Sequence, residues 1–207
     1  LNYPGKFQQS GGTFTSTSGT FTVRGEGGND FYVSGGTFNH NSGTVEIHPA
    51  DWFGYSYINT VPGTTLNNLF INITGPVARL NTDIDVNGTL TLTGNSGQYF
   101  RLNGHTIRLS GDLADTTTNA YFYGDGTLLL DGSADQSVNF GVNASGFFSA
   151  VTIDKTAGTV TAASDPDIDG TFTLTAGTFD LNGQTMTVAG NWSNAGTASI
   201  GTGTVVL

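Results

Sequence analysis

Two runs of alternating oxygen-bearing side chains have the spacing of a calcium-binding loop, with such a residue at every second position and a glycine after the third. Carboxylate and amide oxygens are the hard ligands that Ca²⁺ prefers, but the twelfth positions, Ala176 and Gly94, lack the glutamate that completes an EF-hand. The sequence favours the alternative of a strand that enters an Asx-Gly corner, with its Asp side chains in solvent and Ile or Val inward. The candidate calcium ligands are Asp83, Asp85, Asn87, Asp165, Asp167 and Asp169.

The densest aromatic stretch of the chain lies between residues 52 and 57. Exposed aromatic rings in this stretch would stack on sugar rings or form a contact patch on the surface. The alternative is an enlarged coil or loop that packs its own aromatic side chains on the core. The candidate glycan-binding residues are Trp52, Phe53, Tyr55 and Tyr57.

Asn81, Asp83 and His105 form the arrangement that most suggests catalysis. It resembles polygalacturonase-type β-helix enzymes, a resemblance that implies several carboxylates, a Gly-His-Gly and an Arg-x-Lys nearby. The chain departs from that pattern, because Thr106 follows His105 and an internal repeat places Gln184 at the equivalent position. Paired carboxylates for glycoside hydrolysis could still assemble across coils. We therefore expect no enzyme and no catalytic residue, with a polysaccharide-active enzyme as an alternative.

The composition narrows the class of protein. The chain has 207 residues, no Cys, 6 Lys and Arg against 16 Asp and Glu, and a net charge of −10. Absence of Cys excludes disulfides and thiolate metal sites, and so few cations do not make the basic face that nucleic acid requires. No apolar run approaches the ~20 residues of a membrane span. An acidic, Lys-poor chain rich in Thr, Gly and Asn is typical of an extracellular or cell-surface protein, which is the location we expect.

Internal repeats indicate how these residues are positioned. Within residues 11–47 a Gly-Gly-Thr-Phe segment and a Gly-Thr strand recur after 24 residues, and within residues 66–207 a unit of about 80 residues occurs twice. Each unit has an Asn-Gly or Asp-Gly corner before a strand of alternating polarity, such as the one from Thr89 to Thr93. One such strand cannot bury its apolar face alone, whereas stacked turns of chain can.

We therefore predict an all-β fold, a right-handed parallel β-helix (β-solenoid) of about ten coils that forms a single domain over residues 1–207. Roughly 20 residues per coil and a strand spacing near 4.8 Å give a rod of about 50 Å. The right hand follows from the usual handedness of parallel crossovers. The competing architecture is an antiparallel sandwich or barrel, which the long repeat period and the lack of clear two-residue hairpins disfavour.

Two Leu-Asn-Gly-x-Thr segments, each followed by alternating apolar residues, span residues 102–113 and 181–192. They resemble repeat segments of very large bacterial surface proteins, as do the strands at 87–93 and 203–207. This resemblance implies a right-handed parallel β-helix of the kind found in secreted adhesins. Because such repeats occur in stalks, adhesins and filaments alike, the resemblance implies an architecture and no particular activity.

The two ends carry the residues to which we assign assembly. The last repeat stops on an apolar strand, which would leave an open edge and an uncovered core, and residues 1–10 are off-pattern and would form a cap or a strand exchanged with a neighbour. We expect a structural filament or stalk subunit that stacks head to tail on itself or on flanking repeats of a longer chain. Surface glycans are the alternative partner, and no cofactor is expected unless calcium binds. The assembly residues are Leu1, Tyr3, Phe7, Val205, Val206 and Leu207.

Overall fold

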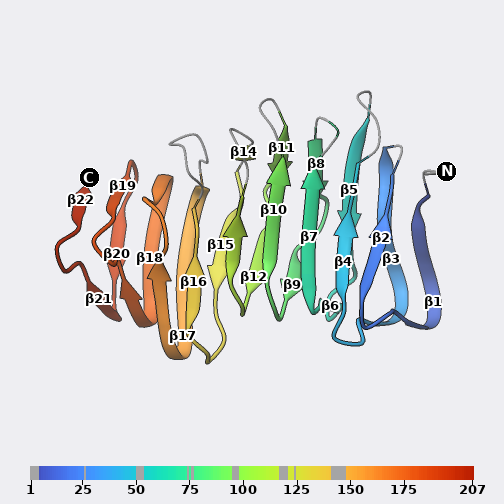
Figure 1. Ribbon diagram of the computed structural model, residues 1–207, viewed down its shortest axis with the longest axis horizontal. Coiled ribbons are helices and arrows are strands. Elements are labelled where there is room, and N and C mark those ends of the chain that lie inside the picture. Colours follow the sequence, from blue (N-terminus) through green and yellow to red (C-terminus); the bar gives the residue numbers. More distant parts are fainter. Residues whose placement is uncertain are drawn as a thin grey trace.

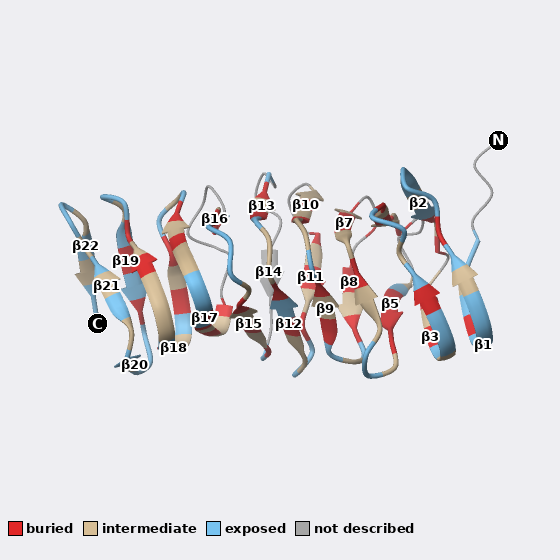
Figure 2. Ribbon diagram, turned by 90° about the horizontal axis from the view of Figure 1, so that it is seen from below, coloured by how far each residue is buried: buried red, intermediate tan, exposed pale blue. Residues whose placement is uncertain are grey.

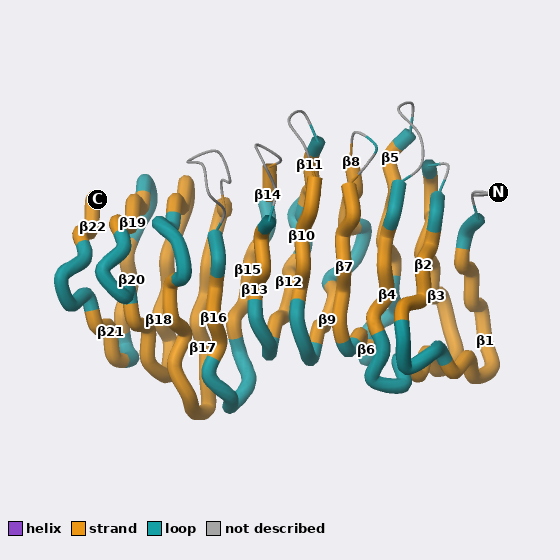
Figure 3. The backbone as a smooth tube through the Cα atoms, viewed as in Figure 1, coloured by secondary structure: helices purple, strands orange, loops and turns teal. Residues whose placement is uncertain are grey.

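The structure, a computed structural model, is a row of stacked β-coils that runs from the N-terminal to the C-terminal end (Figure 1). It describes residues 5–25, 27–49, 54–73, 75, 77–94, 98–116, 121–123, 125–140 and 148–207, with the backbone alone for 121–123. All regular structure in these ranges is strand, and Figure 3 shows the strands joined by loops at the corners of each coil. The predicted all-β class is therefore confirmed.

Three ladders of strands form the walls of the coil. The first ladder begins with β1 (Phe7–Thr15), β3 (Gly28–Asn39), β5 (Tyr55–Asn59), β8 (Val77–Leu80), β11 (Tyr99–Arg101) and β14 (Tyr121–Tyr123). The second begins with β6 (Thr65–Leu66), β9 (Ile84–Val86), β12 (Thr106–Leu109) and β15 (Thr127–Leu130). The third begins with β2 (Thr20–Val23), β4 (Thr44–Ile47), β7 (Asn68–Ile73), β10 (Leu90–Gly94), β13 (Leu113–Asp115) and β16 (Gln136–Val138).

Two long bent strands carry the ladders on toward the C-terminal end. β17 (Phe148–Ala162) and β18 (Asp167–Asp180) pair with each other through register shifts, because each passes from one wall to the next. β19 (Thr185–Val188) and β22 (Thr204–Val206) continue the first ladder, β20 (Trp192–Asn194) the second and β21 (Thr197–Ser199) the third. All pairings between described strands are parallel, so the antiparallel alternative is wrong.

The solenoid makes about eight turns, fewer than the ten predicted. The third ladder stacks nine strands among the described residues, from β2 to β21, and therefore takes eight steps. The turns are also unequal: Thr20 pairs with Thr44, 24 residues later, whereas Asp180 pairs with Ser199, 19 residues later. At a strand spacing of about 4.8 Å this gives a rod of about 40 Å.

The core is a single column of apolar side chains enclosed by the three walls. Residues alternate between inside and outside along each strand, so Leu90 and Leu92 are buried while Thr91 between them is not. Leu90 pairs with Leu69 on one side and Leu113 on the other, so buried side chains stack in files along the axis. Figure 2 shows this alternation of buried and more exposed bands along the strands. Each fully buried large side chain contributes about 1.5–3 kcal/mol to folding.

The long sequence repeat does not coincide with the turns of the coil. Residues 87–93 lead into β10 of the third ladder, whereas their sequence copy at 169–175 lies in the part of β18 that belongs to the second ladder. Likewise, residues 106–109 form β12 of the second ladder, and their copy at 185–188 forms β19 of the first. The same strand sequence therefore fits any of the three walls, because a strand in any wall needs only apolar side chains facing inward that alternate with polar side chains facing outward.

Glycine is required at the coil corners for two different reasons. Asn103-Gly104 and Asn182-Gly183 have positive φ at both residues, as we expected for Asx-Gly corners. Gly88 and Gly170 do not have positive φ, so that expectation is wrong for them. A side chain on Gly170 would instead collide with the backbone carbonyl of Ser149 in the preceding turn. Close approach between turns, rather than backbone conformation, demands glycine there.

Candidate functional site

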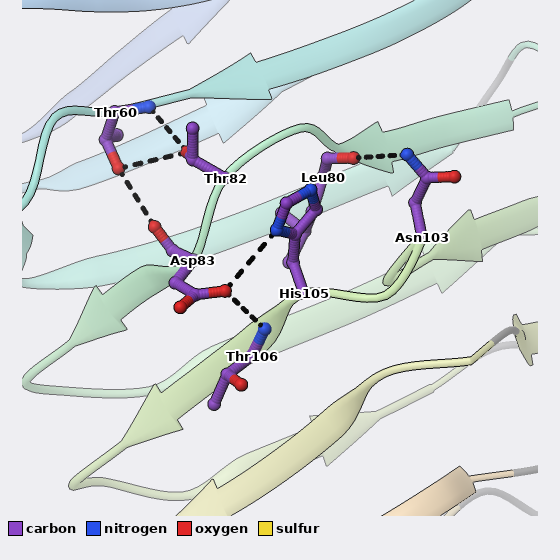
Figure 4. A network of polar contacts seen from close by, with 7 residues as sticks. All are labelled: Thr60, Leu80, Thr82, Asp83, Asn103, His105 and Thr106. Atoms are coloured by element: carbon purple, nitrogen blue, oxygen red, sulfur yellow. Dashed lines mark hydrogen bonds and ion pairs between the residues drawn. The ribbon is translucent and has the colours of Figure 1, made fainter.

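Carboxylates at the coil corners tie successive turns together. Asp83 lies just before β9, and its Oδ1 accepts a hydrogen bond of 2.9 Å from the backbone N–H of Thr106, one turn later (Figure 4). Asp165 accepts one of 2.8 Å from the N–H of Thr185. The same bond is made by Asp112 to Ser137, Asp135 to Thr159 and Asn68 to Thr89, at 2.8 to 2.9 Å. These side chains satisfy backbone donors at the ends of strands, where the ladder bonds stop.

His105 adds a further contact to the Asp83 corner. Its Nδ1 lies 3.4 Å from Asp83 Oδ1, and the hydroxyl of Thr60 donates to the Asp83 carbonyl at 3.2 Å (Figure 4). The Asp83 side chain is 73% exposed, so this pairing takes place in solvent. In the second sequence copy Gln184 replaces His105, yet the bond from Asp165 to the strand amide is kept. The bond common to both corners is therefore structural and does not need the imidazole.

The candidate calcium ligands do not converge on one point. The described residues contain no group of three or more His, Asp or Glu able to hold a metal ion. Asp85 and Asp167 are half-buried on their strands, while Asp165 and Asp169 are exposed. Burial, and then the charge of Asp169, raise the pKa of Asp167 above its ordinary value. The alternating acidic residues therefore behave as the strand entry that the sequence favoured, with Ile84 and Ile168 pointing into the core.

A shallow groove of about 300 Å³ runs beside the second ladder, between the loop at Val61–Thr64 and strands β9 and β12. Asp85 and Arg108 face it. Burial raises the pKa of Asp85, which the charge of Arg108 opposes. Arg108 is already engaged, because it forms an ion pair with Asp131, whose other oxygen accepts the Ser110 hydroxyl at 2.7 Å. The groove is thus lined by the Asp85 carboxylate and by the Arg108 guanidinium, which is already paired with Asp131.

Tyrosines project from the first ladder where the sequence predicts a glycan contact. Tyr55 and Tyr57 alternate with the buried residues of β5, Tyr55 is 45% exposed, and the two ring centroids lie 6.3 Å apart. Both tyrosines therefore lie on the outer surface. The alternative, in which the aromatic side chains of this stretch pack on the core, does not hold for these two residues. The other two predicted contacts, Trp52 and Phe53, lie outside the described residues.

Neighbouring strands extend this surface with residues that the sequence reasoning missed. Arg79 on β8 pairs in register with Tyr57 on one side and Arg101 on the other, and Val77 lies between Tyr55 and Tyr99. We call the surface made by Tyr55, Tyr57, Arg79, Tyr99 and Arg101 the Tyr/Arg face; Val77, between Tyr55 and Tyr99, is buried. The signal was present in the sequence, because a Tyr-x-Tyr, Val-x-Arg, Tyr-x-Arg, Tyr-x-Tyr series recurs every 22 residues from Tyr55 to Tyr123.

The N-terminal end of the coil presents a layer of aromatic rings. Phe7 and Phe14 come from the two halves of β1, on either side of its register shifts, and Phe21 comes from β2. The centroids of the three rings lie 4.7 to 5.5 Å apart. All three are only partly buried, whereas their partners Phe31 and Phe38 in the next turn are buried. Phe7 therefore takes part in the end surface as predicted, while Leu1 and Tyr3 lie outside the described residues.

The last turn of the coil also presents apolar side chains that are only partly buried. Val205 is half-buried, although Met186, with which it pairs, is fully buried. Val206 is 48% exposed and Leu207 79%. Trp192 and Ala198 are also half-buried, over the fully buried Phe172 and Phe179. Among the described strands, β20, β21 and β22 each pair on one side only.

A buried cation inside the coil also escaped the sequence reasoning. Lys155 on β17 is 2% exposed, and its Nζ donates to the side-chain oxygen of Gln136 and to the Asp131 carbonyl. Burial lowers the pKa of Lys155, which the charges of Asp131 and Asp135 oppose. Gln136 in turn donates to the carbonyls of Leu109 and Gly111. These contacts join three successive turns, so we assign the cluster to coil cohesion.

Comparison of this chain with protein-family models, with curated proteins and with solved structures finds no match. A search of the described residues for a helix long and apolar enough to cross a lipid bilayer also finds none. The features of the described residues that bear on function are the corner carboxylates, the groove, the Tyr/Arg face and the two ends.

Proposed function

We propose that the protein is a non-enzymatic structural β-solenoid of the cell exterior, which forms a filament or stalk by stacking end to end. Each end of the rod would continue into a coil of a second copy, so that the strand ladders run on across the junction. Such a contact joins two different surfaces and does not close on itself, and repetition of it generates a fibre.

The observation that carries this proposal is the character of the two terminal turns. Both present half-buried apolar side chains and strand edges that pair on one side only among the described residues. Neither segment 7–23 nor segment 181–207 contains a charged residue, although the chain has 22. Proteins usually protect exposed strand edges with charges, prolines or a covering element. Edges left without such protection favour pairing with another chain.

Two substitutions on β22 distinguish the effect of a charge within the stacking layer from that of the same charge on the outer surface. In β22 the side chain of Val205 points into the coil and that of Val206 points outward, because alternate residues face opposite sides. Val205→Asp would place a carboxylate in the layer that stacking must bury, whereas Val206→Asp adds the same charge where stacking leaves it in solvent. We expect regular fibres of the wild-type protein and of Val206→Asp by electron microscopy, and short rods of Val205→Asp.

A matching pair of substitutions tests the N-terminal end. Phe14→Asp replaces a side chain that points into the coil, and Thr13→Asp replaces one that points outward. Circular dichroism of each variant shows whether the coil still folds. A wild-type protein that stays as single rods at every concentration would overturn the proposal, as would fibres formed equally well by Val205→Asp. Single rods are also what a solenoid continued only by flanking coils of a longer chain would give.

A second candidate function, contact with glycans, is favoured by the Tyr/Arg face. Its rings and guanidinium groups lie on adjacent strands along the outer surface of the rod. Lateral binding and end-to-end stacking use different surfaces, so the two functions are compatible.

A further inference from the structure

The Tyr/Arg face concentrates positive charge on an acidic protein. Two of the four arginines of a chain with net charge −10 lie on it, and Arg79 and Arg101 are direct register partners on β8 and β11. Like charges directly opposite each other in a ladder are destabilising. An anion bound at Arg79 would offset this repulsion.

Arg79 is held in place by a ring and has unused donors. Its guanidinium carbon lies 3.6 Å from the centroid of the Tyr55 ring, a stacked cation–π contact. Within the described part of the chain Arg79 makes no hydrogen bond and no ion pair, and its Nε is buried without a partner. A planar guanidinium fixed in this way is preorganised to donate two parallel hydrogen bonds to a carboxylate.

Aromatic rings flank this positive charge along the rod. Tyr57 precedes Arg79 in one file, and the file beside it runs from Tyr55 over Val77 to Tyr99. Arg101 lies 5.5 Å from the centroid of the Tyr99 ring. Figure 1 shows β5, β8, β11 and β14 side by side, and the backbone of β14 brings Tyr121 opposite Tyr99 and Tyr123 opposite Arg101. Rings and guanidinium groups therefore lie on adjacent strands from β5 to β11.

We propose that the Tyr/Arg face binds an acidic polysaccharide, with its carboxylates on Arg79 and Arg101 and the C–H faces of its sugar rings on Tyr57 and Tyr99. This deepens the glycan-binding function and is independent of end-to-end stacking. A polymer fits because the face extends along the rod over three successive turns, which are about 4.8 Å apart. Nucleic acid fits poorly, because binding it depends on many phosphate contacts with basic residues, and this face has two.

Matched sugars provide the first test. A galacturonate oligomer and its fully methyl-esterified counterpart have the same sugar backbone and differ in charge. Calorimetric titration is done on the Val205→Asp protein, so that assembly does not interfere and failure of stacking is not read as failure of binding. We expect the acid to bind and to weaken as salt is raised, and the ester to bind at least tenfold more weakly.

Matched arginine variants provide the second test. Arg79→Gln is expected to lower the affinity for the galacturonate oligomer at least tenfold, and the double variant with Arg101→Gln to abolish binding. Arg108→Gln removes the same charge from the second ladder and is expected to change affinity less than twofold. No binding of the acid, equal binding of the ester, or equal loss in Arg108→Gln would overturn the proposal. Tighter binding of polyglutamate than of galacturonate would also overturn it, since that result indicates an acidic protein partner.

Discussion

Replacing Gly170 by alanine is expected to destabilise the protein by about 2 kcal/mol, although its φ is one that alanine adopts freely. The added Cβ would collide with the backbone carbonyl of Ser149 in the turn before. The Gly170 carbonyl also accepts a hydrogen bond of 3.1 Å from the N–H of Gly190 in the turn after, and a Cβ on Gly190 would collide with the Gly170 backbone. The Gly170 backbone therefore packs between two turns, and the side that faces Ser149 has no room for a methyl group.

The magnitude follows from what must move. Relief of the collision requires the two turns to separate locally, which weakens two or three backbone hydrogen bonds worth about 1 kcal/mol each. Part of this loss is offset, because alanine reduces the conformational entropy of the unfolded chain and thereby adds roughly 0.4–1 kcal/mol to the free energy of unfolding. The net loss of about 2 kcal/mol corresponds to a fall of roughly 4–8 °C in Tm for a chain of this size.

Alanine substitutions at two other glycines distinguish the effect of a steric collision from that of backbone strain. Gly11 has open space around its Cβ position and no positive φ, so Gly11→Ala is expected to leave stability unchanged or raise it slightly. Gly12 has equally open space but a φ of +66°, and Gly12→Ala is expected to cost about 1 kcal/mol. Urea unfolding followed by circular dichroism measures all three. Equal stability of Gly170→Ala and Gly11→Ala would refute the close-approach reasoning.

The corner and titration properties lead to two further predictions. Asp165→Ala is expected to cost about 1 kcal/mol through loss of the bond to the Thr185 amide, whereas Asp165→Asn keeps the acceptor and is expected to retain the wild-type Tm with or without calcium. A Tm that rises with calcium, and does so only in the wild type, would show that the side chain acts as a metal ligand. The pKa of Asp167 is raised in the folded state, so its ionised carboxylate lowers the free energy of unfolding at neutral pH. This loss of stability disappears as the pH falls through the folded-state pKa toward the ordinary value of 3.8. Asp167→Asn is therefore expected to have the higher Tm at pH 7 and no advantage below pH 3.8; an equal difference at both pH values would contradict the assignment.

Local chemistry explains why the fold was predictable. Alternating residues such as those of Thr89 to Thr93 specify a strand with one apolar face, and the Asx-Gly corners specify where it ends. Repetition of these units leaves stacking as the way to bury the apolar faces. The solenoid and its parallel strands could therefore be derived from the sequence alone, whereas the sequence left open whether Tyr55 and Tyr57 pack on the core or lie on the surface.

The count of turns and the use of the corner residues could not be derived in this way. The number of residues per turn depends on how far each loop reaches, and it falls from 24 near Thr20 to 19 near Ser199. The spacing of Asp165 and Asp167 suits a metal loop as well as a corner, and the sequence does not show that the Thr185 amide lies one turn away, within hydrogen-bond distance of Asp165.

The sequence by itself determined the strand type, the corner chemistry and the stacking of turns, because these depend on residues within a few positions of one another. Only the tertiary structure decided which residues meet across turns. The register places Arg79 on Tyr57 and beside Arg101, and it carries the two copies of the long repeat onto different walls. The physical reason is that each wall accepts any alternating strand, so the lengths of the loops, summed along the chain, set the register.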